Sequence, residues 1–271
     1  MILIGTSGYY FDDWKGVFYP SGLAKRDFLA YYSSRFPALE LNSSYYAVPS
    51  DSLVRALTEN TPAGFQVVVK AYKGITHERA VSAGEVQAAF LQAIEPLAAA
   101  GKLAAVLYQF PQSFRYGSAN LELMGRILEG GGGLPAVVEF RHASWMNEQA
   151  WVYLRRYEAG FCCVDEPVLP GLMPPEAVCT SGRTGYLRFH GRNAEKWWNH
   201  REAWERYDYL YPDEELSGWL NNIRWLEGRT DKTFIFFNNH RSGQAAKNAA
   251  GLERLLGITP PAAGHEQQTL F

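Results

Sequence analysis

The sequence predicts an α/β protein of the (β/α)8, or TIM-type, barrel class, folded as a single domain. Eight short apolar strands alternate with segments whose apolar residues recur at helical spacing. This alternation is typical of parallel strands joined by helical crossovers. A length of 271 residues suits one such barrel. We assign residues 1–258 to the barrel domain and residues 259–271 to a flexible C-terminal tail.

The strands and helices follow in order along the chain. Predicted strands cover 2–8, 38–44, 65–71, 104–110, a fifth run that begins at Ala136, then 161–165, 185–191 and 233–239. Predicted helices cover 27–36, 52–60, 84–100 with an interruption at Pro96, 120–129, 145–158, 213–226 and 244–256. Four prolines from Pro167 to Pro175 predict that the sixth helix is missing or reduced to one turn. A long insertion follows the seventh strand.

The fifth strand ends in two opposite charges. Glu139 and Arg141 are two residues apart and therefore project to the same side of a strand. Charges at the end of a buried strand are costly to desolvate, so they indicate a binding site or a buried ion network.

The other strands repeat this design, with polar residues near their C-terminal ends. We expect these side chains to converge on one mouth of the barrel, where barrel enzymes place their chemistry. An alternative interpretation is a structural ion network that closes this mouth. The expected inward set is Glu40, Asn42, Lys70, Gln109, Glu139, Arg141, Asp165, Arg188, His190 and Asn238.

The members of this set suggest separate roles. Glu40, Glu139, Asp165 and His190 are the candidate catalytic groups, with His190 as the inward residue able to transfer a proton near neutral pH. Lys70, Arg141 and Arg188 would neutralise a negatively charged substrate, assisted by Asn42, Gln109 and Asn238. Glu139, Asp165 and His190 could also hold a divalent metal, although no HxH or HExxH spacing supports this.

A second clue lies after strands seven and eight, where barrels often bind phosphate at a helix N-terminus. Ser242 is a plausible N-cap for the last helix, and Arg192 and Arg241 would add positive charge. An ordinary capped loop remains the alternative. Trp197, Trp198 and other aromatic residues of the insertion could stack on bases or sugars, or pack together.

Six motifs resemble the YecE-like proteins, the domain-of-unknown-function family 72. They are GTSGY (5–9), ELNSSYY (40–46), QFP (109–111), EFRHASW (139–145), LRFHG (187–191) and FFNNH (236–240). The resemblance covers nearly the whole chain and implies a TIM-barrel-like fold, but no reaction. At the level of fold alone, the barrel resembles DNA-repair barrels of the endonuclease IV type, whose histidine-rich metal cluster is not matched here.

The tail ends in QQTLF. Gln267, Leu270 and Phe271 resemble the QxxLF peptide with which bacterial polymerases and repair proteins bind the replication sliding clamp. The alternative is a tail that packs on the barrel through its apolar side chains.

Composition gives little indication of a partner. A formal net charge of −2 provides no global attraction to nucleic acid or membrane, although it leaves room for a local basic patch, and we see no signal peptide or membrane span. Three cysteines without CxxC spacing indicate reduced thiols in a cytoplasmic protein.

We therefore expect a barrel that binds a phosphorylated small molecule or a nucleic-acid-like ligand. As an enzyme it would be a hydrolase or lyase. The alternatives are a glycoside hydrolase with paired carboxylates and a non-catalytic protein that binds a ligand or the clamp.

Overall fold

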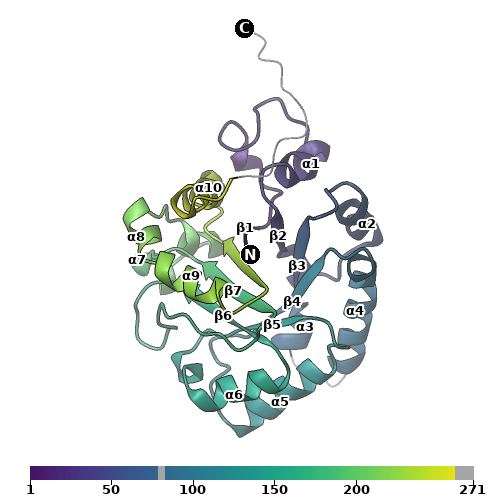
Figure 1. Ribbon diagram of the computed structural model, residues 1–271, viewed down its shortest axis with the longest axis vertical. Coiled ribbons are helices and arrows are strands. Elements are labelled where there is room, and N and C mark those ends of the chain that lie inside the picture. Colours follow the sequence, from purple (N-terminus) through teal and green to yellow (C-terminus); the bar gives the residue numbers. More distant parts are fainter. Residues whose placement is uncertain (79–82, 260–271) are drawn as a thin grey trace.

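The computed structural model describes residues 1–78 and 83–259, and its centre is a closed barrel of eight parallel strands in sequence order (Figure 1). The predicted (β/α)8 barrel is confirmed. The strands are β1 (Ile2–Ser7), β2 (Ala38–Leu41), β3 (Gln66–Lys70), β4 (Leu103–Gln109), β5 (Ala136–Glu139), β6 (Gly160–Asp165), β7 (Thr184–Phe189) and β8 (Lys232–Phe237).

Pairing between the first and last strands closes the barrel. Ile2 is in register with Thr233, and the pairs continue to Thr6 opposite Phe237. On its other edge β1 pairs with β2, starting at Gly5 and Ala38. Because every neighbouring pair is parallel, all eight C-terminal strand ends meet at the same mouth.

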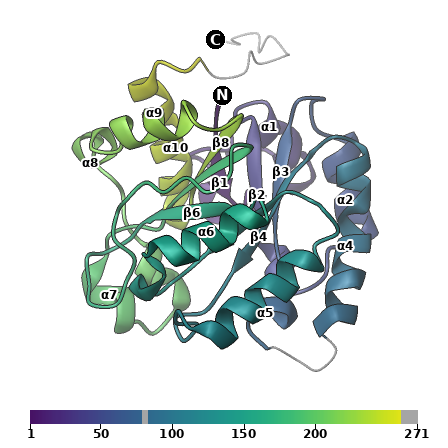
Figure 2. The same cartoon turned by 60° about the horizontal axis from the view of Figure 1, so that its bottom comes forward.

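Helices surround the barrel (Figures 1 and 2). Amphipathic spacing explains the longer helices, whose apolar sides pack against neighbouring strands or helices. They are α1 (Phe28–Ser33), α2 (Asp51–Glu59), α3 (Lys73–Thr76), α4 (Ala83–Ala99), α5 (Ser118–Glu129), α6 (Glu148–Arg156), α7 (Ala194–Trp198), α8 (Asp213–Ser217), α9 (Leu220–Glu227) and α10 (Gln244–Leu256). Within residues 1–78 and 83–259, no helix has the length and hydropathy needed to cross a membrane.

The connection from β6 to β7 contains no helix over residues 166–183, as the prolines predict. Two other helix predictions need correction. Pro96 does not interrupt α4, because it faces solvent, where the carbonyl group it leaves unpaired can be hydrated. The predicted helix 213–226 is divided into α8 and α9, where Trp219 turns its indole N–H toward Asp165.

Alternation along β5 and the loop after it positions the first charges of the site. Phe140 points away from the barrel axis and stacks on Trp145, with ring centroids 4.1 Å apart. The indole N–H of Trp145 donates to the carbonyl of Phe114 at 2.6 Å. With Phe140 fixed on the outer side, Glu139 and Arg141 face inward.

Candidate ligand-binding site at the barrel mouth

Arg188 of β7 lies at the centre of the barrel, near the C-terminal ends of the strands. Its guanidinium donates to Glu40 Oε1 at 2.6 Å and to Glu139 Oε2 at 2.5 Å, and all three side chains are buried. Tyr186, two residues before Arg188, donates its hydroxyl to Glu40 Oε2 at 2.6 Å. Two carboxylates therefore share one buried arginine, which joins β2, β5 and β7.

Glu139 has two further inward partners. Arg141 Nε lies 2.6 Å from Glu139 Oε1, and His190 Nε2 lies 3.2 Å from the same oxygen. Burial alone would raise the pKa of Glu139, but Arg141, Arg188 and His190 hold that pKa well below its usual range. Glu139 is therefore a charged acceptor with its oxygens in use, which makes it a poor proton donor.

His190 is fully buried and carries no charge at neutral pH. Burial, with added repulsion from Arg141 and Arg188, lowers its pKa well below 6.5. Its Nδ1 lies 3.2 Å from the side-chain amide of Asn238, which fits a neutral ring that accepts from that amide at Nδ1. The expectation that His190 titrates near neutrality is therefore wrong.

Lys70, the last residue of β3, differs from these paired groups. Its ammonium donates to Gln109 Oε1 at 2.8 Å and lies 4.4 Å from the centre of the Tyr45 ring. Burial first, and then repulsion from Arg188 and Arg141, lower the pKa of Lys70 to about 7. Gln109 Oε1 also accepts from Arg141 at 3.3 Å, so it links the two cations.

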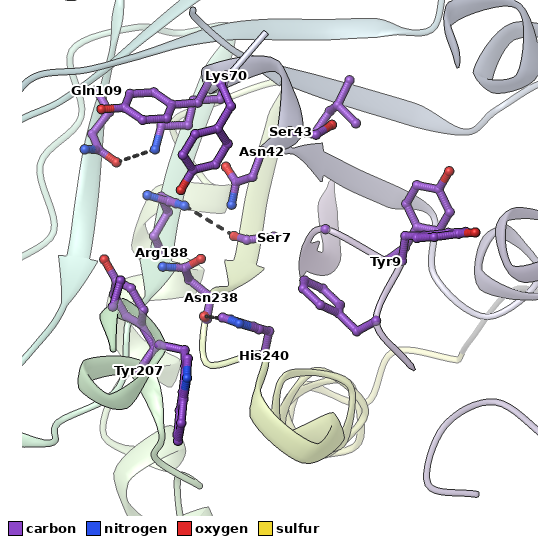
Figure 3. Close-up of a pocket in the computed structure, with 18 of the residues that line it drawn as sticks. Ser7, Tyr9, Asn42, Ser43, Lys70, Gln109, Arg188, Tyr207, Asn238 and His240 are labelled. Carbon is purple, nitrogen blue, oxygen red and sulfur yellow. Dashed lines mark hydrogen bonds between the residues drawn. The ribbon is translucent and has the colours of Figure 1, made fainter. Parts of the chain in front are cut away.

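A cavity of about 650 Å³ opens above these groups (Figure 3). Its floor contains Lys70, Arg141 and Arg188 together with neutral amides and Ser7, whereas Glu40, Glu139 and His190 lie beneath and do not line it. Aromatic side chains form much of its wall, namely Tyr9, Tyr10, Phe11, Tyr45, Tyr46, Trp204 and Tyr207. A smaller cavity of about 190 Å³ adjoins it and shares Gln109, Arg141 and Tyr207.

Some polar atoms of the lining residues are left unpaired. Arg188 Nε and Asn42 Oδ1 have no hydrogen-bond partner among the residues that the structure describes. Buried polar groups without a partner are rare in folded proteins, and a bound molecule is one way to satisfy them. The floor therefore contains both an ion network, as the alternative interpretation proposed, and groups that a ligand could contact.

Most of the predicted inward set does meet at this mouth. Ser7, Tyr45 and His240 line the cavity without having been predicted, whereas Tyr207 belongs to the insertion whose aromatic residues were expected at the mouth. The aromatic residues that follow β2 and β8 in the sequence were a signal for Tyr45 and His240. The residues that converge as expected are Glu40, Asn42, Lys70, Gln109, Glu139, Arg141, Arg188, His190 and Asn238.

Asp165 does not belong to this group, and its predicted inward orientation is wrong. Its carboxylate accepts two bonds from Arg192, at 2.8 and 2.6 Å. The hydroxyl of Tyr211 and the indole N–H of Trp219 donate to it at 2.7 and 2.6 Å. These four side chains form a saturated cluster on the outer side of β6. Asp165 therefore cannot act with Glu139 and His190 as base or metal ligand.

The inward carboxylate after β6 is Glu166. Its Oε2 lies 3.6 Å from Arg141 Nη1, and its Oε1 accepts the backbone N–H of Met173 at 3.0 Å. Burial raises the pKa of Glu166 to about 7, against the opposing effect of Arg141. Sequence reasoning missed this residue because it assigned the wrong alternation to β6.

The predicted phosphate site at the start of α10 has no geometric support. Ser242 does not cap the helix, since its backbone N–H donates to Asp13 Oδ2 at 2.7 Å and its φ is 50°. Arg192 is paired with Asp165, and the guanidinium of Arg241 lies 4.0 Å from the Trp204 ring.

No cluster of three or more His, Cys, Asp or Glu side chains suited to a metal occurs within residues 1–78 and 83–259. The clamp-like residues Gln267, Leu270 and Phe271 lie outside the described residues.

The fold and the cavity define the class of this protein: a parallel (β/α)8 barrel with a charged, aromatic-walled cavity at its strand C-termini. Within that class, the chain belongs to the family described as protein of unknown function DUF72, whose model matches residues 3–269. The resemblance predicted from the motifs is confirmed.

Relatives in this family match over nearly their whole length. UPF0759 protein YunF of Bacillus subtilis (strain 168) is 33% identical over 287 residues, which cover 100% of each chain. The DUF72 family protein TM1631 of Thermotoga maritima MSB8 is 40% identical, with a TM-score of 0.87 over 95% of this chain and 99% of that one. A DUF72 family protein of Enterococcus faecalis V583 (ef0366) is 28% identical, with a TM-score of 0.86 over 96% of each chain.

Proposed function

We propose that the protein binds a phosphate-containing ligand of nucleotide size in the large cavity and acts on it as a hydrolase or lyase. The observation that carries this proposal is the separation of charge at the floor. Lys70, Arg141 and Arg188 line the cavity, whereas their carboxylate partners Glu40 and Glu139 lie below it. At the floor a bound ligand would thus meet donors and positive charge, which favours an anion there, whereas the lining carboxylate of Glu202 belongs to the insertion after β7.

The wall favours a ligand that also has a ring. Tyr9, Tyr45 and Tyr207 present apolar faces that can stack on a base or sugar, as aromatic residues do in nucleotide-binding sites. A volume of about 650 Å³ is within the range of small-molecule pockets. The combination of a cationic floor and an aromatic wall supports a nucleotide or a sugar phosphate.

For proton transfer, the geometry favours Lys70 over the expected Glu139 and His190. Lys70 lines the cavity and its pKa of about 7 allows it to accept or donate a proton near neutral pH. Glu139 and His190 are sealed beneath the floor. The same burial gives little support to the glycoside hydrolase alternative, because Glu40 and Glu139 are both bound to Arg188 and do not face the cavity.

Calorimetric titration with nucleoside monophosphates and the matching uncharged nucleosides tests this proposal. We expect the phosphate to improve affinity at least tenfold, and Lys70→Met to remove most of that gain. Lys73→Met is the matched control, because Lys73 begins α3 three residues later, and its partly exposed ammonium group is paired with Glu78. Equal binding of nucleotides and nucleosides, or equal loss in both variants, would contradict the proposal.

The spacing of Gln267, Leu270 and Phe271 supports a separate proposal, that these residues bind a bacterial replication sliding clamp. Fluorescence anisotropy with a labelled peptide of residues 259–271 tests it. We expect saturable binding to the clamp that is lost in a Leu270→Ala/Phe271→Ala peptide. Identical signals from the two peptides would refute it.

A further inference from the structure

Lys70 has an unusual combination of burial and unused bonding capacity. Within the described residues, its ammonium group has one hydrogen-bond acceptor, Gln109 Oε1, and no carboxylate is paired with it. The flat face of Tyr45 covers another side. Lys70 nevertheless lines the large cavity and remains partly exposed.

A lysine that serves only the fold looks different in the same protein. Lys102 is buried as well, but its ammonium donates to Thr58 O at 2.7 Å and to Thr61 O and Oγ1 at 2.8 Å. All three of its protons are therefore engaged, and it borders neither of the two cavities described above. Lys70 lacks this saturation and is open to a reacting molecule.

We propose that Lys70 is an amine nucleophile that forms an imine with the carbonyl carbon of a phosphorylated aldehyde or ketone bound in the cavity. This inference rests on the proposed function for the phosphate and adds the reacting group of the substrate. It assigns Lys70 covalent chemistry in addition to the charge that its protonated form offers an anion.

The step balances without an oxidant or reductant. The neutral amine adds to the carbonyl carbon, and one of its protons passes to the carbonyl oxygen to give a carbinolamine. The C–O bond then breaks, the hydroxyl group leaves as water with the second amine proton, and a C=N bond joins the substrate to Nζ. Protonated, this imine withdraws electrons from the adjacent carbon, so that a proton or a leaving group there can be removed before water regenerates the amine.

The surroundings suit both halves of such a substrate. The pKa of Lys70, about 7, results from burial and from Arg188 and Arg141, while Glu139 and Glu40 oppose it. A large fraction of the amine is thus free at neutral pH, as in lysines activated by a neighbouring cation. The two guanidinium groups that suppress its charge also line the floor and can hold a phosphate.

Trapping with sodium cyanoborohydride tests the inference on the full chain. The probes are dihydroxyacetone phosphate and glyceraldehyde 3-phosphate, each compared with its unphosphorylated form, and peptide mass spectrometry locates the reduced adduct. We expect labelling of Lys70 at least tenfold above that of Lys102 and Lys73, and stronger labelling by the phosphorylated probes. Lys70→Arg retains a cation but has no reactive amine, so the adduct should disappear.

Equal labelling of all the lysines would contradict imine formation at Lys70, even if the protein still binds nucleotides. Equal labelling of Lys70 by the phosphorylated and unphosphorylated probes would support imine formation and contradict the phosphate-binding function. Because Lys70→Arg could fail to fold, the unmodified protein supplies a second measurement. The rate of Lys70 reaction with trinitrobenzenesulfonate should rise through a midpoint near pH 7. A midpoint near 10 would overturn the inference.

Discussion

Arg188 lies 2.6 Å from Glu40, although 148 residues separate them in the chain. The same guanidinium lies 2.5 Å from Glu139, so one cation balances two buried carboxylates from other strands. Removal of Arg188 would leave both without their shared partner in a site with almost no solvent access.

We therefore expect Arg188→Met to lower the free energy of unfolding by about 3–5 kcal/mol, the usual cost of breaking a buried pair. Urea unfolding followed by circular dichroism measures it. Arg155→Met is the control, because the Arg155–Glu148 pair is exposed and its loss should cost at most about 1 kcal/mol. Similar values for the two variants would show that Arg188 has no special structural role.

Anion binding should depend on the charge of Lys70. Sulfate is a suitable probe because it remains a dianion throughout the pH range of interest. Below its pKa of about 7 the amine is protonated and attracts sulfate, and above that pH it loses the charge. A bound anion favours the protonated amine, so the midpoint of the effect should lie at or above pH 7. We expect affinity to fall about tenfold across this range and to become flat in Lys70→Met, as measured by calorimetry. An unchanged pH profile in the variant would exclude Lys70 as the titrating group.

Glu166→Gln should stabilise the protein at alkaline pH. The folded-state pKa of Glu166 is about 7, above the ordinary value of 4.5, so ionisation of the buried carboxyl costs stability as pH rises through 7. The glutamine variant avoids that cost, and its melting temperature should exceed that of the unmodified protein at pH 8.5 and match it at pH 4.

Glu253→Gln provides the comparison, because burial raises the pKa of Glu253 to about 7 on α10, away from the cavity lining. Both variants should gain alkaline stability. Only Glu166→Gln should strengthen sulfate binding, since it removes negative charge 3.6 Å from Arg141. Equal sulfate affinities in the two variants would show that the charge of Glu166 does not affect the binding site.

Asp165→Asn should affect stability and leave ligand binding almost unchanged. The substitution removes the charge that pairs with Arg192 and one acceptor of the cluster formed with Tyr211 and Trp219. We expect a loss on the order of 2–4 kcal/mol in unfolding free energy. Sulfate affinity should stay within about twofold in calorimetric titrations. A large loss of sulfate affinity in a folded variant would show that Asp165 contributes to the binding site.

The contrast between β5 and β6 explains how far the sequence could predict this site. Along β5 and the loop after it, Glu139 and Arg141 alternate with apolar residues, and this pattern defines the inner side of the strand. In β6, the run FCCVD has apolar residues on both sides, as expected for a strand buried on both faces. The sequence of β6 therefore does not distinguish its inner from its outer side, and the choice of Asp165 over Glu166 as the inward residue is wrong.

Other errors arose from partners that are distant along the chain. Asp165 accepts hydrogen bonds from Trp219 and Tyr211, which lie 54 and 46 residues away from it in the chain. No local sequence pattern predicts these partners. Nor could periodicity show that Glu139 and His190 would be covered, since burial depends on how all eight strands close. The strand order and the missing helix after β6 were predictable because they follow from local apolar runs and prolines.

Trp204 belongs to the segment inserted after β7, and its ring lies 4.0 Å from the guanidinium of Arg241, in the loop after β8. The wall of the cavity is thus built on connections outside the strands, whereas the ion pairs of Arg188 join residues of β2, β5 and β7. Substitutions in the inserted segment should therefore change which molecules fit the cavity without altering these ion pairs. Ligand selectivity and the charge of the floor are thus carried by separate parts of the barrel.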